Sequence, residues 1–144
     1  MKNSKGFSLL ELLIVVAIIL IIATIAIPSL LRSRQAANES AAVANLRTIN
    51  TAEVTYLSSS GGTYGEMDDL IAARLLDDTF TGTKAGYNYD LELDATGNDY
   101  TATAVPAASN TGRYGYYSTP DAVVRYSTTA TLAPTAAQAG RSVQ

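Results

Sequence analysis

The stretch GFSLLELLIVVAIILIIATIAIPSLLRSR, residues 6–34, decides how the rest of the chain is interpreted. From Leu12 to Leu31 it contains no charged residue. As a helix, that run would rise about 30 Å, which matches the hydrocarbon core of a bilayer. It therefore predicts a membrane-spanning helix over about residues 7–31. Glu11 stands just before the run, and a carboxylate at this position is costly unless its charge is used.

The composition argues against several classes of function. The 144 residues include no Cys and no His, so disulfides, thiolate metal sites and the commonest general base near neutral pH are all missing. The net charge is −3, and the scattered arginines form no basic stripe for a phosphate backbone. We therefore expect a protein that is not an enzyme, has no cofactor or metal, and does not bind nucleic acid.

A helical period continues beyond the apolar run. Pro28 lacks the N–H that would bond the carbonyl of Thr24, so it marks either a kink in a helix or its end. Apolar residues nevertheless recur after it at three- and four-residue steps, at Val43, Leu46, Ile49, Ala52 and Tyr56. We expect one helix over residues 7–57, kinked at Pro28 and amphipathic over about 32–57. It should end near SSSGG, residues 58–62, where two glycines can cap it.

The basic segment MKNSKG, residues 1–6, leaves two ordinary alternatives open. One is a secretory signal peptide that is cut after residues 24–26, Thr-Ile-Ala, although this gives Glu11 no role. The other is a simple anchor helix. Its orientation stays open because Arg32 and Arg34 balance the two lysines of the leader.

The string Gly6-Phe7-Ser8-Leu9-Leu10-Glu11-Leu12-Leu13 resembles the class III signal of type IV pilins and pseudopilins. In that signal a short basic leader and a Gly precede a Phe, and a Glu follows four residues later. The resemblance covers about the first 57 residues closely and includes Pro28. It implies that a prepilin peptidase cuts between Gly6 and Phe7, removes residues 1–6 as a leader peptide, and methylates the new amine of Phe7.

The resemblance also implies a use for Glu11. In the family, the matching carboxylate attracts the N-terminal amine of a neighbouring subunit during assembly, and opposite charges attract more strongly in a low dielectric than in water. Glu11 and Phe7 would then be the assembly residues, and the segment from Leu20 to Pro28 would bend or unwind in the filament. The alternative is that Glu11 reaches the lipid headgroups or stabilises the N-terminus of its own helix.

Three functions remain open at this point. The first is a type IV pilus subunit, stored in the inner membrane as a single-pass precursor, passed to a pilus assembly platform, and built into an extracellular helical homo-oligomer. The second is a major pseudopilin of a type II secretion system, which would stay periplasmic. Those proteins often carry acidic calcium-binding residues near the C-terminus, and nothing acidic follows Asp121 here, which favours the pilus. The third is a membrane-anchored binding domain that does not polymerise.

Residues 58–127 predict a globular head, which gives the chain a pilin-like α+β fold. Met67, Leu70, Ile71 and Leu75 share one face of a short helix. The alternating segment 87–93 is the clearest strand, and further strands are expected at 100–105, 114–117 and 122–126. An antiparallel sheet of three to four strands should therefore cover the apolar stripe of the long helix.

Three weaker features complete the prediction. Residues 128–144 are Ala-, Thr- and Ser-rich, so we expect an exposed tail whose hydroxyls could carry O-linked sugars. Asp94, Asn98 and Asp99 offer oxygens for calcium, but the bidentate Glu of an EF-hand loop is missing and a plain acidic turn is favoured. The nine tyrosines could support conduction along a fibre, although their strand spacing is more typical of a sheet core.

Overall fold

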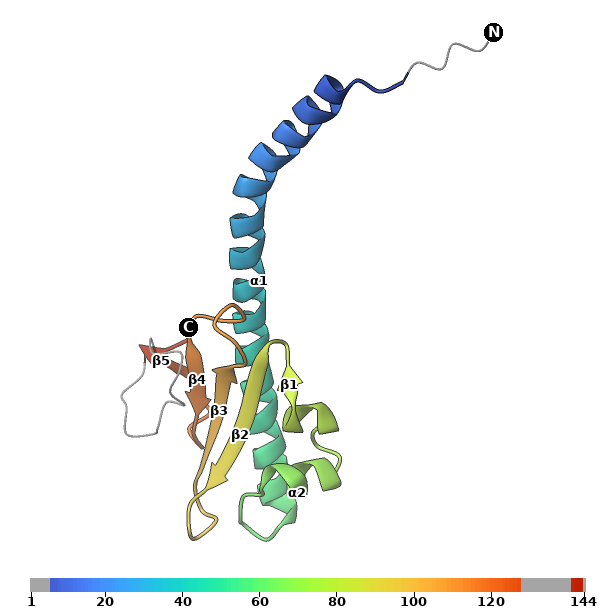
Figure 1. Cartoon of the computed structure of the whole chain (residues 1–144). Coiled ribbons are helices and arrows are strands. Elements are labelled where there is room, and N and C mark those ends of the chain that lie inside the picture. The colour runs from blue at the N-terminus through green and yellow to red at the C-terminus, as the bar shows by residue number, and fades with distance from the viewer. Residues whose placement is uncertain (1–5, 128–140, 144) are drawn as a thin grey trace. The chain divides into compact units, whose positions relative to one another are not determined.

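The computed structural model describes residues 6–127 and 141–143 (Figure 1). The chain divides into two compact units, of which the first ends at Ser33 and the second begins at Arg34. Helix α1, Leu9–Ser59, runs through both. Pro28 lies inside it, so the predicted continuation past the proline is confirmed. The Thr24 hydroxyl donates to the Ile21 carbonyl at 2.7 Å, one turn back.

Helix α1 ends at the predicted glycines. Gly61 and Gly62 have φ of 84° and 103°, a left-handed region that glycine enters without steric cost. The Gly62 N–H donates to the Leu57 carbonyl at 3.2 Å and satisfies one of the last free acceptors of the helix. The chain therefore leaves α1 where glycine permits the reversal.

The second half of α1 buries one face against the sheet (Figure 1). The buried positions follow helical spacing and are Glu39, Ala42, Leu46, Ile49, Asn50, Ala52 and Glu53. The predicted stripe at Leu46, Ile49 and Ala52 is confirmed, and Val43 and Tyr56 pack at its margins. Two acids and an asparagine on this buried face were not predicted.

The sheet is an antiparallel meander in which each strand pairs with the next in sequence. Its six described strands are β1 (Thr83–Lys84), β2 (Tyr87–Leu93), β3 (Tyr100–Pro106), β4 (Gly115–Ser118), β5 (Arg125–Ser127) and β6 (Arg141–Ser142). In β2, Tyr87, Tyr89 and Leu91 are buried and the polar residues between them are exposed, as predicted. The α+β fold is thus confirmed.

Two short helical segments precede the sheet: α2, Met67–Ala72, and the 3₁₀ helix η1, Asp78–Thr81. The predicted short helix is therefore present. Leu70 of α2 and Phe80 of η1 enter the core. Helix α2 stops before Arg74, whose φ of 59° is incompatible with a right-handed helix. Leu75 nevertheless packs against the core from the following turn.

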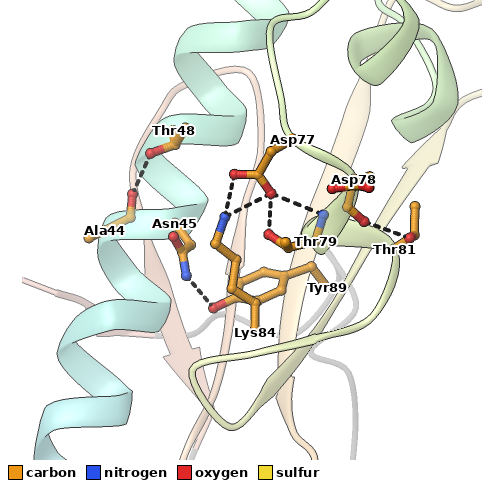
Figure 2. A network of polar contacts seen from close by, with 9 residues as sticks. All are labelled: Ala44, Asn45, Thr48, Asp77, Asp78, Thr79, Thr81, Lys84 and Tyr89. Atoms are coloured by element: carbon orange, nitrogen blue, oxygen red, sulfur yellow. Dashed lines mark hydrogen bonds and ion pairs between the residues drawn. The ribbon is translucent and has the colours of Figure 1, made fainter.

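Polar contacts join α1 to β2, and join the residue before η1 to β1 (Figure 2). The Asn45 side-chain amide of α1 donates to the Tyr89 hydroxyl of β2 at 2.8 Å. Lys84 Nζ of β1 lies 2.9 Å from the Asp77 carboxylate and 3.9 Å from the centre of the Phe80 ring. Hydrogen bonds from the Thr79 and Lys84 side chains hold the pKa of Asp77 below its usual value. Strands β1 and β2 are therefore held to their neighbouring elements by charge and hydrogen bonding as well as by apolar packing.

The sheet has six described strands where three to four were predicted, and the strand expected at 122–126 begins only at Arg125, because Ala122 has a left-handed φ of 59°. The additional strands lie at the two edges. Strands β1 and β6 have two residues each, too short to show a period of their own. Strand β6 falls in the stretch expected as an exposed tail, where Val143 packs against the core and its N–H donates to the Val124 carbonyl at 2.8 Å. Residues 128–140 and 144, with the hydroxyls considered for glycosylation, lie outside the described residues.

The β1–β2 turn gives a prediction for stability. Its two central residues, Ala85 and Gly86, have φ of 52° and 76°. Left-handed conformations cost a residue with a Cβ about 1 kcal/mol, and asparagine tolerates them best among such residues. We expect Ala85→Asn to raise the free energy of unfolding by about 0.5 kcal/mol. Denaturant titration of the full chain in detergent micelles measures this, and a lower midpoint would contradict it.

Candidate functional site

The segment ahead of α1 is open. Gly6 and Phe7 are both exposed, and 81% of the Phe7 surface is accessible. A Cβ placed on Gly6 would meet no other atom within 4 Å. The peptide bond between Gly6 and Phe7 is thus accessible in this chain, and any steric demand for glycine at position 6 must come from another protein that handles the bond.

The Glu11 carboxylate forms a hydrogen bond at the N-terminus of its own helix. Its Oε2 accepts a hydrogen bond from the Ser8 N–H at 3.0 Å, and the Ser8 hydroxyl oxygen accepts one from the Leu10 N–H at 3.3 Å. Ser8 therefore caps α1 by accepting from the N–H of the second helical residue. Glu11, at the third helical position, accepts from the Ser8 N–H, as the glutamate of a capping box does. Sequence analysis did not single out Ser8, although the spacing Ser-x-x-Glu before an apolar run is a signal for this motif.

The large apolar side chains of the run that follows, up to Leu31, are exposed in the described chain. Large side chains along it are exposed by roughly half or more of their surface, including Leu9, Leu12, Ile21, Ile25 and Leu30. In the described residues, α1 is the one helix long and apolar enough to cross a membrane. A contiguous apolar surface of this size requires lipid or another protein around it.

Three of the predicted site residues lie close together, and the fourth, Pro28, lies farther along α1. Gly6, Phe7 and Glu11 lie within the first turn of α1 and the residues just before it. Pro28 follows Glu11 by about 25 Å of helix. The kink expected there stays a prediction.

The acidic turn between β2 and β3 uses its carboxylate internally. Asp94 Oδ1 accepts hydrogen bonds from the N–H groups of Asn98 and Asp99 at 2.8 and 3.1 Å. The Thr96 hydroxyl, together with these N–H groups, holds the pKa of Asp94 below its usual value. Over residues 6–127 and 141–143, no group of three or more acidic side chains could hold a metal ion.

The tyrosines lie in and beside the sheet. Tyr87, Tyr89, Tyr100, Tyr116 and Tyr117 are buried. Three ring pairs have centroids 4.8 to 6.0 Å apart, namely Tyr64–Tyr100, Tyr87–Tyr116 and Tyr114–Tyr126. This is the packing of a sheet core that strand spacing predicts.

An ion pair between a buried glutamate and an exposed arginine joins α1 to the loop between β3 and β4. The Glu39 carboxylate accepts three hydrogen bonds from Arg113: from its backbone N–H at 2.8 Å, Nε at 3.0 Å and Nη2 at 2.9 Å. Burial alone would raise the pKa of Glu39, but the hydrogen bonds and charge of Arg113 outweigh it and hold that pKa below its usual value. Beside this pair, the Asn38 amide donates to the Thr111 carbonyl at 2.8 Å. Glu39 shares helical spacing with Ala42 and Leu46, but a charged residue in such a stripe more often lies at its margin, so the spacing alone did not predict its burial.

Comparison with known proteins places these features in one family. Residues 1–27 match the prokaryotic N-terminal methylation motif. The chain is 32% identical over 130 residues to the type IV wide pilus major component PilA4 of Thermus thermophilus, covering 90% of this chain and 92% of that protein. It is 43% identical over 56 residues to the type IV major pilin protein PilA of Myxococcus xanthus, covering 39% and 26% of the two chains.

A relative from a secretion system is also found. The chain is 28% identical over 119 residues to the type II secretion system core protein G of Escherichia coli, covering 80% of this chain and 78% of that protein. No solved structure matches significantly. Because the Thermus pilin is similar over nearly its whole length, the chain belongs to the family of type IV pilins and type II secretion pseudopilins, which are structural subunits and not enzymes.

Proposed function

We propose that the chain is the subunit of a type IV pilus that is cut between Gly6 and Phe7, methylated on the Phe7 amine, and assembled outside the cell. Family membership implies processing by a prepilin peptidase, anchoring in the inner membrane and assembly into a filament. We assign the anchor to residues 7–31 and the filament core to bundled copies of α1. The helical homo-oligomer would form from membrane-stored subunits delivered to an assembly platform.

One observation carries this proposal. A single carboxylate, Glu11, lies in the first turn of a helix whose apolar side chains are uncovered up to Leu31, and the Gly6–Phe7 bond just ahead of it is open. A simple anchor needs the apolar run alone and gains from Glu11 no more than the bond to the Ser8 N–H at the start of its helix. A subunit that must dock against copies of itself gains a specific contact from it.

Glu11 can accept a neighbour's amine while it caps its own helix. Cutting after Gly6 would turn the Phe7 nitrogen into an ammonium group, and each subunit would then carry one cation and one anion near the start of α1. A carboxylate offers about four lone-pair positions, and the Ser8 N–H occupies one of them. Attraction between the ammonium of one copy and the Glu11 of the next would be strong because the surrounding helices have a low dielectric constant.

A role as a secretion pseudopilin is the second candidate. The Escherichia coli protein supports it, with lower identity and coverage than the Thermus pilin. The absence of acidic residues after Asp121 favours the pilus. The candidates can be separated by shearing cells and examining the released material. Electron microscopy shows whether it contains filaments, and mass spectrometry gives the mass of its subunit. Surface filaments whose subunit begins at a methylated Phe7 support the pilus. A subunit that begins at a methylated Phe7 but stays with the cells, without surface filaments, supports the secretion pseudopilin, and an uncut subunit that stays with the membranes indicates an anchored binding domain.

Glu11→Ala is expected to reduce the filament yield about tenfold or more, because the ion pair between subunits is lost. Cutting at Gly6 and residence in the membrane should persist, since the helix becomes more apolar. Immunoblots of sheared and membrane fractions measure both quantities.

Glu11→Gln is the matched control. Glutamine at this position can keep the capping box with Ser8 but carries no charge. Filaments restored by Gln would assign Glu11 to helix capping alone and contradict the ion pair. Partial recovery with Glu11→Asp and none with Gln would support it.

A further inference from the structure

Glu53 is a carboxylic acid sealed inside the head. It lies on the buried face of α1 with 0% of its surface exposed. Its Oε2 accepts a hydrogen bond from the Gly65 N–H at 3.1 Å. Its Oε1 is buried and has no hydrogen-bond partner within the described residues. Such an orphaned oxygen in a native core calls for an explanation, since desolvating a polar group without a partner is costly.

The groups that face Glu53 are acids and phenols. Helix α2 brings Asp69, whose charge acts on Glu53. Strand β3 brings Tyr100, which is almost wholly buried and donates its hydroxyl to Asn50 of α1 at 2.9 Å. Tyr100 in turn contacts Tyr64 of the loop before α2, whose ring meets the Tyr100 ring edge-on. Among the described groups that influence Glu53 there is no Lys or Arg, in contrast to Glu39 with its Arg113.

Nothing in this environment except a proton can neutralise the carboxylate. Burial raises the pKa of Glu53 to about 7; the Gly65 hydrogen bond opposes this shift and the charge of Asp69 adds to it. Glu53 therefore changes charge close to neutral pH, whereas an exposed glutamate would do so near pH 4.5.

Residues 60–66 cover Glu53, and they would have to move for water to hydrate the ionised carboxylate. A Cβ on Gly65 would lie 2.8 Å from the Tyr56 ring and 3.2 Å from Asp69 Cβ, so the backbone at Gly65 lies tightly between α1 and α2. Water can reach an ionised Glu53 only if this backbone lifts. Further hydrogen bonds also hold residues 60–66. The Ser60 and Gly62 N–H groups donate to the Tyr56 and Leu57 carbonyls of α1, the Tyr64 N–H donates to the Gly97 carbonyl, and the Glu66 N–H donates to the Asp69 carboxylate.

We propose that Glu53 is a proton-operated latch: in its neutral form it holds residues 60–66 and α2 against α1, and when it ionises it releases them. The closed segment keeps its proton up to about pH 7, whereas the open, hydrated segment loses it above about pH 4.5. The stabilisation by the latch is therefore complete below about pH 4.5 and is lost as the pH rises through 7. The head opens at this corner in alkaline surroundings and closes in acidic ones.

Hydrogen exchange of the full chain in detergent micelles tests the latch. Backbone amides of residues 60–69 are followed by mass spectrometry between pH 5 and pH 8, with rates corrected for the intrinsic pH dependence of exchange. We expect the opening equilibrium of this segment to increase between about tenfold and a hundredfold over that range. In Glu53→Gln, which keeps the shape of the neutral acid, the segment should stay as protected at pH 8 as the wild type is at pH 5.

Glu39→Gln is the matched control, because it is the same change at another buried glutamate of α1. It removes the ion pair with Arg113, so it should loosen residues 107–114 and leave the pH dependence of residues 60–69 intact. Wild-type exchange at 60–69 that does not vary with pH would overturn the latch. The same holds if Glu53→Gln retains the wild-type pH dependence, or if Glu39→Gln abolishes it equally.

Discussion

Replacing Gly6 by Leu is expected to stop maturation almost completely and to leave the uncut precursor in the inner membrane. Within the described residues, a Cβ at position 6 would meet no atom within 4 Å apart from its chain neighbours, so a leucine should not disturb the fold. The expected loss arises in the active site of the peptidase, where a bulky side chain beside the scissile bond would prevent close approach. Without the cut, no free amine forms at Phe7 to pair with Glu11 of a neighbour. Intact-mass measurement of the membrane fraction and filament counts after shearing report both effects.

Gly6→Ala provides a graded comparison. A single methyl group should slow the cut without abolishing it, so processed subunits and some filaments are expected. Equal processing of the Gly6, Ala and Leu forms would remove the assignment of this bond as the cleavage site. A mature protein that begins at Ile27 would instead indicate an ordinary signal peptide.

The second large effect is expected at Gly112→Ala, inside the head. A Cβ there would lie 2.0 Å from the Tyr87 hydroxyl oxygen and 2.5 Å from Cζ of the same ring. The ring cannot withdraw, because Tyr87 is fully buried and donates its hydroxyl to the Tyr114 carbonyl at 2.9 Å. Overpacking of this kind destabilises a core by about 1–3 kcal/mol, and we expect the upper end or more. Denaturant titration of the head in micelles, followed by tyrosine fluorescence, measures the loss.

Gly82→Ala is the control for Gly112→Ala. Gly82 has a φ of −124°, which any residue adopts, and a Cβ there meets no atom within 4 Å. Its midpoint should stay within about 0.5 kcal/mol of the wild type. Similar denaturation midpoints for the two variants would show that the β3–β4 loop can shift to accommodate the added methyl group, and would contradict the prediction.

The sequence predicted the elements whose signal is local and repeated. The apolar run and the continuing helical period predicted α1, and the strict alternation of β2 predicted its buried face, with Tyr87 and Leu91 inside. Glu11 stood out because a charge beside a long apolar run is unusual, and Phe7 because the string around it resembles the class III signal. Each of these features can be recognised from a few neighbouring residues.

What sequence could not reveal depends on partners far along the chain. Glu39 belongs inside only because Arg113 reaches it, and Glu53 is buried without any cation nearby. A charged residue on an apolar stripe is more often placed at its margin, so neither position signals burial by itself. Strand β6 has two residues, and its pairing with β5 becomes visible only once the sheet has formed.

The contact between Glu39 and Arg113 has a consequence for how the protein withstands its chemical surroundings. The chain contains no cysteine, so the tie between α1 and the β3–β4 loop consists of charge and hydrogen bonds. Such a tie forms as soon as the chain folds and requires no oxidising enzyme to close it. Thiol reductants leave it intact, whereas strong acid opens it by protonating Glu39. A change in redox conditions therefore leaves this contact between Glu39 and Arg113 intact.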